Sequence, residues 1–361
     1  MKPRLPPVPA AAWTALLALL AAWLLTWTSS GLAATPDTDN DLAGRSLALQ
    51  RAHQAVLGVQ VIALEGARSN ATLGRVRRGS GVLIGADGVV LTIGYLVLEA
   101  EQVQLALGDG RSIPARVLGY DVATGFGLVQ ALAPLSIDPV ALGSAASAPL
   151  GGGGASQQPL MVASGGDNGQ VSAAQLVSRR AFSGYWEYHI EGALFTTPPR
   201  RDHSGAGLFN ARGELVGIGS LLVADAVGVA DGDEQSRQSG NMFVPVDLLL
   251  PILDDLRQRG SSAASRRAWL GMNCVEQSGS LRVVRVSDDS PADVAGLLPG
   301  DRILRIDGTE VRALATLWQT LWAGGAPERE VVLEIERDQQ ARTLKVFSVD
   351  RAKTLRRAEG I

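Results

Sequence analysis

The chain has 361 residues, of which 46% are hydrophobic and 19% charged, so it can bury ordinary cores and is not a disordered protein. This length suggests two or three domains, and 42 glycines with only 5% aromatic residues favour β architecture with many turns. The formal net charge of −3 argues against nucleic acid as the main partner, because no basic excess is available to neutralise phosphates. One cysteine excludes an intramolecular disulfide framework and a cysteine-rich metal site. The three histidines, His53, His189 and His203, are scattered in sequence, so a zinc site is not expected; no cofactor is predicted either.

Residues 1–34 have the pattern of an export signal. A short positively charged start precedes an uncharged apolar run over residues 10–27, and small residues follow where a signal peptidase could cut. The run is longer than an ordinary signal core and approaches the length that spans a bilayer. Two interpretations therefore remain open, a cleaved signal peptide and a retained N-terminal anchor. Both export the rest of the chain, as into a Gram-negative periplasm.

The next segment, residues 42–257, alternates short apolar runs with turn signals and is predicted to be one β-rich domain. Residues 35–41 are polar and predicted to be disordered, and residues 42–57 predict an amphipathic helix. Strands or hairpins are predicted at 59–64, 79–94, 103–118, 125–131, 160–163, 171–178, 185–191 and 213–222. Residues 149–158 predict a flexible connection between two halves, residues 229–241 an exposed loop, and residues 244–256 a helix bent or opened at Pro251.

A second β-rich unit follows a short polar segment. Residues 258–267 are rich in serine and arginine and predict a linker, and residues 268–350 predict the second unit. Two helices are expected in it, at 291–296 and at about 313–323. Cys274 lies between apolar residues and is predicted to be a buried thiol on a strand.

Residues 203–219 carry the strongest functional pattern in the first domain. Ser204 stands in a glycine-rich turn that precedes an apolar pair, a polar turn and an apolar strand. Glycines there let the backbone bend so that amide groups point to one spot beside the hydroxyl. This segment resembles the active-serine segment of trypsin-like proteases of the HtrA family, with Ser204 in the place of the nucleophile.

The same resemblance extends over most of residues 50–258. The matching segments are 79–84 with the turn 86–88, 91–97, 108–115, 119–129 and 241–247. The resemblance implies a trypsin-like double six-stranded β-barrel.

The chain departs from the family at the positions that carry catalysis. The family's general base falls on Tyr95, whose phenol has a pKa of about 10 and cannot take a proton from serine near pH 7 as imidazole does. The orienting aspartate falls on Gly125, which has no carboxylate. Around Ser204, Asp202 replaces a glycine, and Ala206-Gly207 replace the usual Gly-Pro. These changes predict a protease-like domain without triad-type peptidase activity. An active serine endopeptidase with a non-standard site on Ser204 is the alternative.

The remaining polar candidates have structural interpretations. Tyr95 is expected to be a packed aromatic residue whose hydroxyl is hydrogen-bonded in the cleft where the family has its catalytic site. His203 is expected to lie at the surface and not to act as a base. His189 in a strand and His53 in the first helix are expected to be structural. The segment Arg200-Arg201-Asp202 is expected to be a solvated charged loop.

The second unit resembles a PDZ domain of the HtrA type, from the helix start Ser290-Pro291-Ala292 and the turn Pro299-Gly300-Asp301. The resemblance assigns the carboxylate-binding loop to residues 269–272. There Gly271 would let the amides of Leu270, Gly271 and Met272 converge on a peptide C-terminus, while the peptide adds to the sheet edge. The predicted peptide-binding residues are Trp269, Leu270, Gly271, Met272, Leu317, Trp318 and Leu321. A PDZ domain that only supports its neighbour is the alternative.

Together these observations predict a mainly β, exported, HtrA-like protein, active in envelope protein quality control or scaffolding. The expected partners are peptide C-termini or unfolded envelope proteins. By resemblance the chain forms a homo-oligomer, a trimer, or a mixed oligomer with active relatives. No nucleic acid partner is expected.

Overall fold

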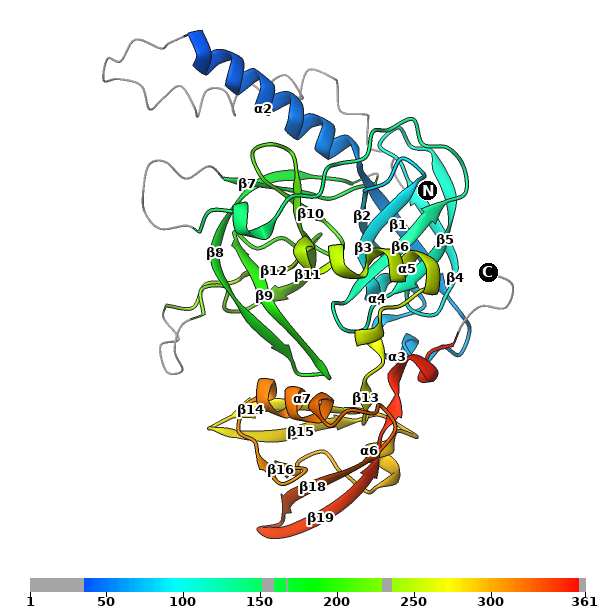
Figure 1. Ribbon diagram of the computed structural model, residues 1–361, viewed down its shortest axis with the longest axis vertical. Helices are drawn as coiled ribbons and strands as arrows, with labels where there is room; N and C mark the ends of the chain where they lie inside the picture. Colours follow the sequence, from blue (N-terminus) through cyan, green and yellow to red (C-terminus); the bar gives the residue numbers. More distant parts are fainter. Residues whose placement is uncertain (1–35, 151–158, 167, 229–235, 357–361) are drawn as a thin grey trace, which may run out of the picture. The chain divides into compact units, whose positions relative to one another are not determined.

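The computed structural model describes residues 36–150, 159–166, 168–228 and 236–356 (Figure 1). The chain divides into two units, Met1–Gly44 and Arg45–Ile361, and both predicted β-domains lie in the second. The predicted export signal at residues 1–34, most of the predicted connection at 149–158 and residues 229–235 lie outside the described residues. Within the described ranges, no helix is long and apolar enough to cross a membrane.

The first helix is longer than the sequence predicted. Helix α2 spans Pro36–Gln54, so the prediction of disorder at residues 35–41 is wrong from Pro36 onward. Proline is well suited to the first turn of a helix, because its missing N–H has no partner there and its fixed φ is already helical. At the other end of the helix, Ala52 is buried, which ties the helix to the first barrel.

Two closed six-stranded barrels form the first domain, as predicted (Figure 1). The first barrel has the order β1 (Val56–Ala63), β2 (Val76–Leu83), β3 (Val89–Ile93), β6 (Phe126–Ala131), β5 (Ser112–Tyr120), β4 (Ala100–Ala106). The predicted hairpin at 79–94 is confirmed as β2 and β3, and Gly88 takes a φ of +83° in its turn, a conformation that favours glycine. All five residues of β3 are buried, as expected of a strand inside a barrel wall.

The second barrel has the order β10 (Gly207–Phe209), β11 (Leu215–Val223), β12 (Gly240–Pro245), β9 (Tyr188–Thr197), β8 (Val171–Gly184), β7 (Leu160–Ala163). Strands β8 and β9 form one long hairpin whose turn is residues 185–187. The strand predicted to begin at residue 185 therefore begins at Tyr188, because residues 185–187 form the turn.

The segment after the second barrel is more broken and more tightly packed than predicted. Instead of one helix over 244–256, there are two short 3₁₀ turns, η3 (Val246–Leu248) and η4 (Leu250–Ile252), followed by helix α5 (Leu253–Arg259). Proline lacks the N–H that a continuous α-helix needs, so Pro251 stands at the start of a new turn. The predicted linker at 258–267 is not a free tether, because Ser262 and Ser265 are buried and both donate to the Asp121 carboxylate.

Residues 268–350 form the PDZ domain. Its main sheet has the order β14 (Met272–Gln277), β15 (Ser280–Val286), β16 (Arg302–Ile306), β18 (Glu330–Arg337), β19 (Gln340–Phe347), with β17 (Thr309–Glu310) beside β16. Strand β13 (Ala268–Trp269) pairs with β20 (Val349–Asp350) and joins the two ends of the domain. Helices α6 (Pro291–Val294) and α7 (Leu314–Ala323) match the predicted ones. The domain has its own apolar core, which includes the predicted buried thiol of Cys274.

Candidate functional site

The turn that carries Ser204 is locked between the two barrels. The Ser80 amide on β2 donates to the Ser204 carbonyl at 2.8 Å, and the Gly205 amide donates to the Gly219 carbonyl at 2.8 Å. Gly205 has a φ of +74°, and a Cβ there would lie 1.9 Å from the Ser80 carbonyl oxygen. Only glycine fits this position, since any side chain would both strain the backbone and displace β2.

Tyr95 on the short helix α4 (Gly94–Val97) reaches the Ser204 hydroxyl. Its Oη lies 2.8 Å from Ser204 Oγ and 2.9 Å from the Ser220 carbonyl oxygen. A phenol has one proton and a carbonyl can only accept, so both bonds form when Tyr95 donates to Ser220 and Ser204 donates to Tyr95. Burial raises the pKa of Tyr95 to about 12, against the lowering effect of the bond with Ser204. The serine proton therefore points at a neutral phenol.

Gly125 is in a left-handed backbone conformation, close to the side chain of Tyr188. Its φ is +83°, and a Cβ there would lie 3.1 Å from the Tyr188 hydroxyl oxygen. Tyr188 is itself fixed, because its hydroxyl donates to the Thr124 carbonyl at 2.6 Å. The resemblance would place a carboxylate at Gly125. The phenol of Tyr188, on β9 of the second barrel, borders that space.

Asp202, two residues before Ser204, belongs to a half-buried ionic network. Arg200 donates to its carboxylate from Nε at 3.0 Å and from Nη2 at 2.5 Å, and the Ser164 hydroxyl donates to the same group. Burial alone would raise the pKa of Asp202, but these bonds hold it below the ordinary value. The Arg200 side chain is only 9% exposed and also donates to Ser172, so the prediction of a solvated loop is wrong for this residue. Arg201 is exposed.

None of the three histidines contacts Ser204 in the described hydrogen bonds. His203 is half-buried rather than at the surface, and its Nδ1 donates to the Arg200 carbonyl at 2.9 Å. His189 lies in β9, where Nδ1 bonds Ser183 and Nε2 bonds Glu191. Burial lowers the pKa of His53 in α2. In the part of the chain that the structure describes, no cluster of acidic, histidine or cysteine side chains is placed to hold a metal ion.

The predicted carboxylate-binding loop of the PDZ domain holds a carboxylate in this structure. The amides of Leu270, Gly271 and Met272 converge on the side chain of Glu187 at 2.8–3.3 Å, where the sequence analysis expected a peptide C-terminus. Gly271 has a φ of +86°, and a Cβ there would lie 2.2 Å from the Ser290 Cβ, so the loop depends on glycine. Burial raises the pKa of Glu187 to about 7, against the lowering effects of Arg351 and of the three amide donors.

The helix side of the predicted groove is also in contact with the first domain. Trp318 Nε1 donates to the Gly184 carbonyl at 2.9 Å, and the Gln319 side-chain amide lies 3.0 Å from His189 Nε2. Leu317 and Leu321 are fully buried in the PDZ core, and Trp269 is 9% exposed. The assignment of Leu317 and Leu321 to the groove wall stays a prediction.

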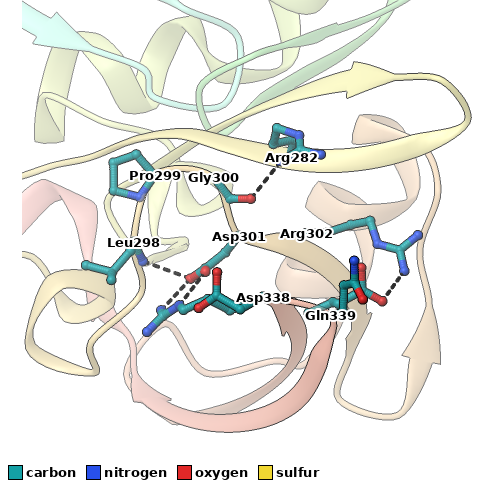
Figure 2. Close-up of a pocket in the computed structure, with 10 residues that line it drawn as sticks. Arg282, Leu298, Pro299, Gly300, Asp301, Arg302, Asp338 and Gln339 are labelled. Carbon is teal, nitrogen blue, oxygen red and sulfur yellow. Dashed lines mark hydrogen bonds and ion pairs between the residues drawn. The ribbon is translucent and has the colours of Figure 1, made fainter.

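A further cavity of about 480 Å³ opens elsewhere on the PDZ domain (Figure 2). Its charged groups bond one another: Arg337 binds the buried Asp301 through two contacts of 2.6 Å, and Arg302 pairs with Glu336 at 2.5 Å. Arg282 donates to the Gly300 carbonyl at 3.0 Å. Because these charged groups already bond one another, we assign the cavity a structural role in the domain.

Two residues that matter to the site do not follow from the sequence analysis. Residues 185–191 predict a strand, which conceals the turn at Glu187, and nothing local connects Tyr188 with Gly125. A lone acid among aromatic residues in Tyr185-Trp186-Glu187-Tyr188 is the one local signal that could have marked a hairpin turn.

Comparison with known proteins agrees with this geometry. The trypsin-like peptidase domain family matches residues 79–218, and the PDZ domain family matches residues 268–347. A protein of Hahella chejuensis named "Probable periplasmic serine endoprotease DegP-like" is 27% identical over 248 residues, covering 64% of this chain and 49% of the relative. A protein of the same name from Ectopseudomonas mendocina is 26% identical over 280 residues, covering 74% and 55%.

A solved structure titled "HtrA-type protease AlgW with tripeptide" matches the fold with a TM-score of 0.50 and 22% identity, covering 86% of this chain and 97% of that one. The chain therefore has a trypsin-like peptidase domain followed by a PDZ domain, and it shares its fold with the solved structure of an HtrA-type protease. It spans about half the length of the curated relatives named above.

Proposed function

We propose that this protein is an exported peptide-binding or scaffolding module, whose peptidase-like domain lacks triad-type activity. The observation that carries the proposal is the bond of 2.8 Å between Ser204 Oγ and the Tyr95 phenol. A serine nucleophile needs a base that accepts its proton at neutral pH. A phenol with a pKa near 12 keeps its own proton there and cannot take a second one.

The turn before Ser204 supports the same proposal. By resemblance, Asp202 stands where the family has the glycine that contributes an oxyanion-binding amide. Its carboxylate is held ionised in a network with Arg200 and Ser164, so this turn is built around an ion pair and not around the family's glycine. Without a triad, only a residual acceleration of about 10³–10⁴ remains, and it depends on an oxyanion hole. Both sources of catalysis are therefore weakened together.

A fluorophosphonate probe tests the proposal directly, because labelling needs an activated serine. We expect neither the native protein nor Ser204→Ala to be labelled or to cleave casein, while trypsin in the same buffer is labelled and cleaves. Circular dichroism of both preparations controls for folding. Labelling or casein cleavage that Ser204→Ala abolishes would instead establish the alternative, an endopeptidase with a non-standard site on Ser204.

Restoring the two triad residues is not expected to restore activity. In Tyr95→His/Gly125→Asp, the new aspartate would adopt a φ of +83°, and its Cβ would lie in tight contact with the Tyr188 hydroxyl, at 3.1 Å. The turn around Asp202 would also still differ from that of the family, and one lost oxyanion donor costs about 10²–10³ in rate. The measurement is casein hydrolysis over hours, with Ser204→Ala added to the double variant as control. Robust hydrolysis would mean that the turn around Ser204 is intact.

The PDZ domain supplies the binding activity in this proposal. Three amides arranged around one carboxylate form a site for the free C-terminus of a peptide, and this supports peptide C-termini or unfolded envelope proteins as partners. The location of the protein is a separate part of the proposal. The export pattern of residues 1–34 and the relatives named as periplasmic support a periplasmic location. An oligomer, homomeric or mixed with active relatives, is part of the proposal. Intact-mass measurement of the exported protein distinguishes a cleaved signal from an anchor at residues 10–27.

A further inference from the structure

The turn between β8 and β9 touches the PDZ domain at the three features that a bound peptide would use. These are the carboxylate-binding loop, the free edge of strand β14, and helix α7. The contacts come from Gly184, the last residue of β8, and from Tyr185 and Glu187 of the turn.

The first contact fills the loop. Glu187 is only 4% exposed, and its carboxylate accepts from Gly271 N at 2.8 Å, from Leu270 N at 3.1 Å to each oxygen, and from Met272 N at 3.3 Å. A peptide's terminal carboxylate would need the same amides. One set of three N–H groups cannot hold two carboxylates, so the two ligands exclude each other.

The second and third contacts fill the groove beside the loop. Strand β14 pairs with β15 on one side and has no strand on its other edge in the described sheet. At that position the Cys274 amide donates to the Tyr185 carbonyl at 2.7 Å, as it would to the backbone of an added strand. Opposite β14, Trp318 Nε1 on α7 donates to the Gly184 carbonyl at 2.9 Å. The turn therefore lies between strand and helix, in the course that a peptide would follow.

We propose that the β8–β9 turn is an internal ligand of the PDZ groove, in which the Glu187 side chain takes the place of a peptide's C-terminal carboxylate. This rests on the proposed peptide-binding function. A peptide with a free C-terminus binds only after the turn has left, so its apparent affinity is reduced by the fraction of molecules whose groove is open. The groove thus selects ligands that compete well with Glu187.

Glu187→Gln tests the proposal in the full-length exported chain, since it keeps the shape of the side chain and removes the anion that the three amides need. The probe is a short fluorescein-labelled peptide that ends in a free valine carboxylate, titrated by fluorescence anisotropy. We expect Glu187→Gln to bind at least about tenfold more tightly than the native chain. Glu101→Gln is the matched control, because it neutralises a carboxylate that forms an exposed pair with Arg75 on the first domain. It should bind like the native chain.

The outcomes separate this proposal from the proposed function. Equal affinity of the native chain and Glu187→Gln overturns the internal ligand and leaves peptide binding intact. No binding by any of the three proteins overturns the peptide-binding function and the internal ligand with it. If Glu187→Gln fails to fold, the proposal is tested by measuring amide hydrogen exchange of the native chain with and without peptide. Saturating peptide should speed exchange of the amides at 184–188, and unchanged exchange there overturns the proposal.

Discussion

Amidating the C-terminus of a peptide ligand will reduce its affinity for the isolated PDZ domain, residues 266–350, by at least about 30-fold. The free domain lacks Glu187, so the amides of Leu270, Gly271 and Met272 are open to a peptide carboxylate. A hydrogen bond to a charged group contributes about 1.5–3 kcal/mol, and a loss of about 2 kcal/mol corresponds to a factor of 30. Strand β13 pairs with β20, so this segment includes both strands that close the domain.

Isothermal titration calorimetry with matched free and amidated peptides measures this loss. Acetylating the peptide N-terminus is the control, because that end lies away from the loop and its modification should leave the affinity unchanged. If free and amidated peptides bind equally well, the loop is not a carboxylate receptor and the domain only supports its neighbour.

Arg337→Ala will destabilise the PDZ domain by about 3 kcal/mol. Asp301 is 1% exposed, and Arg337 binds both of its carboxylate oxygens at 2.6 Å (Figure 2). Removing one partner of a buried pair leaves an uncompensated charge, which costs about 3–5 kcal/mol. The Arg337 side chain is 20% exposed, so water can partly replace it and the lower end of that range applies.

Urea denaturation of the PDZ segment measures this change, and Arg302→Ala is the matched control. Arg302 pairs with Glu336 at 2.5 Å, but both side chains are more than a third exposed, so its loss should cost at most about 1 kcal/mol. An Arg337→Ala variant no less stable than Arg302→Ala would contradict the role of the buried pair.

The same pair predicts a dependence of stability on pH. Burial alone would raise the pKa of Asp301, but Arg337 and the Leu298 amide hold it below the ordinary value. A carboxylate whose pKa is lower in the folded state stabilises that state above the unfolded pKa of about 3.9. The stabilisation is lost as the pH falls through the lower folded pKa. Denaturation curves from pH 7 to pH 3 should therefore show a constant difference between native domain and Arg337→Ala down to about pH 4, and a shrinking difference below it.

Most of the strands could be predicted because their signals are local. The hairpin at 79–94 follows from two β-branched runs around Ala86-Asp87-Gly88, and only neighbouring residues are needed to form that turn. The segment at 244–256 was harder, because its apolar spacing fits a helix while Pro251 divides it into short turns. The linker at 258–267 was misjudged, since the residue that Ser262 and Ser265 bind, Asp121, lies far away in sequence.

The sequence by itself determined the two domains, and by resemblance it predicted that Ser204, Tyr95 and Gly125 stand where the family has its nucleophile, its base and its aspartate. Those features depend on residue identity and on short motifs. Only the tertiary structure decided that Tyr95 bonds Ser204 and that Glu187 accepts from the amides of the loop at residues 269–272. Glu187 and Gly271 are 84 residues apart, and a hydrogen bond depends on distance and angle within narrow limits. Such contacts arise from how the strands pack against each other, which no local pattern in the sequence specifies.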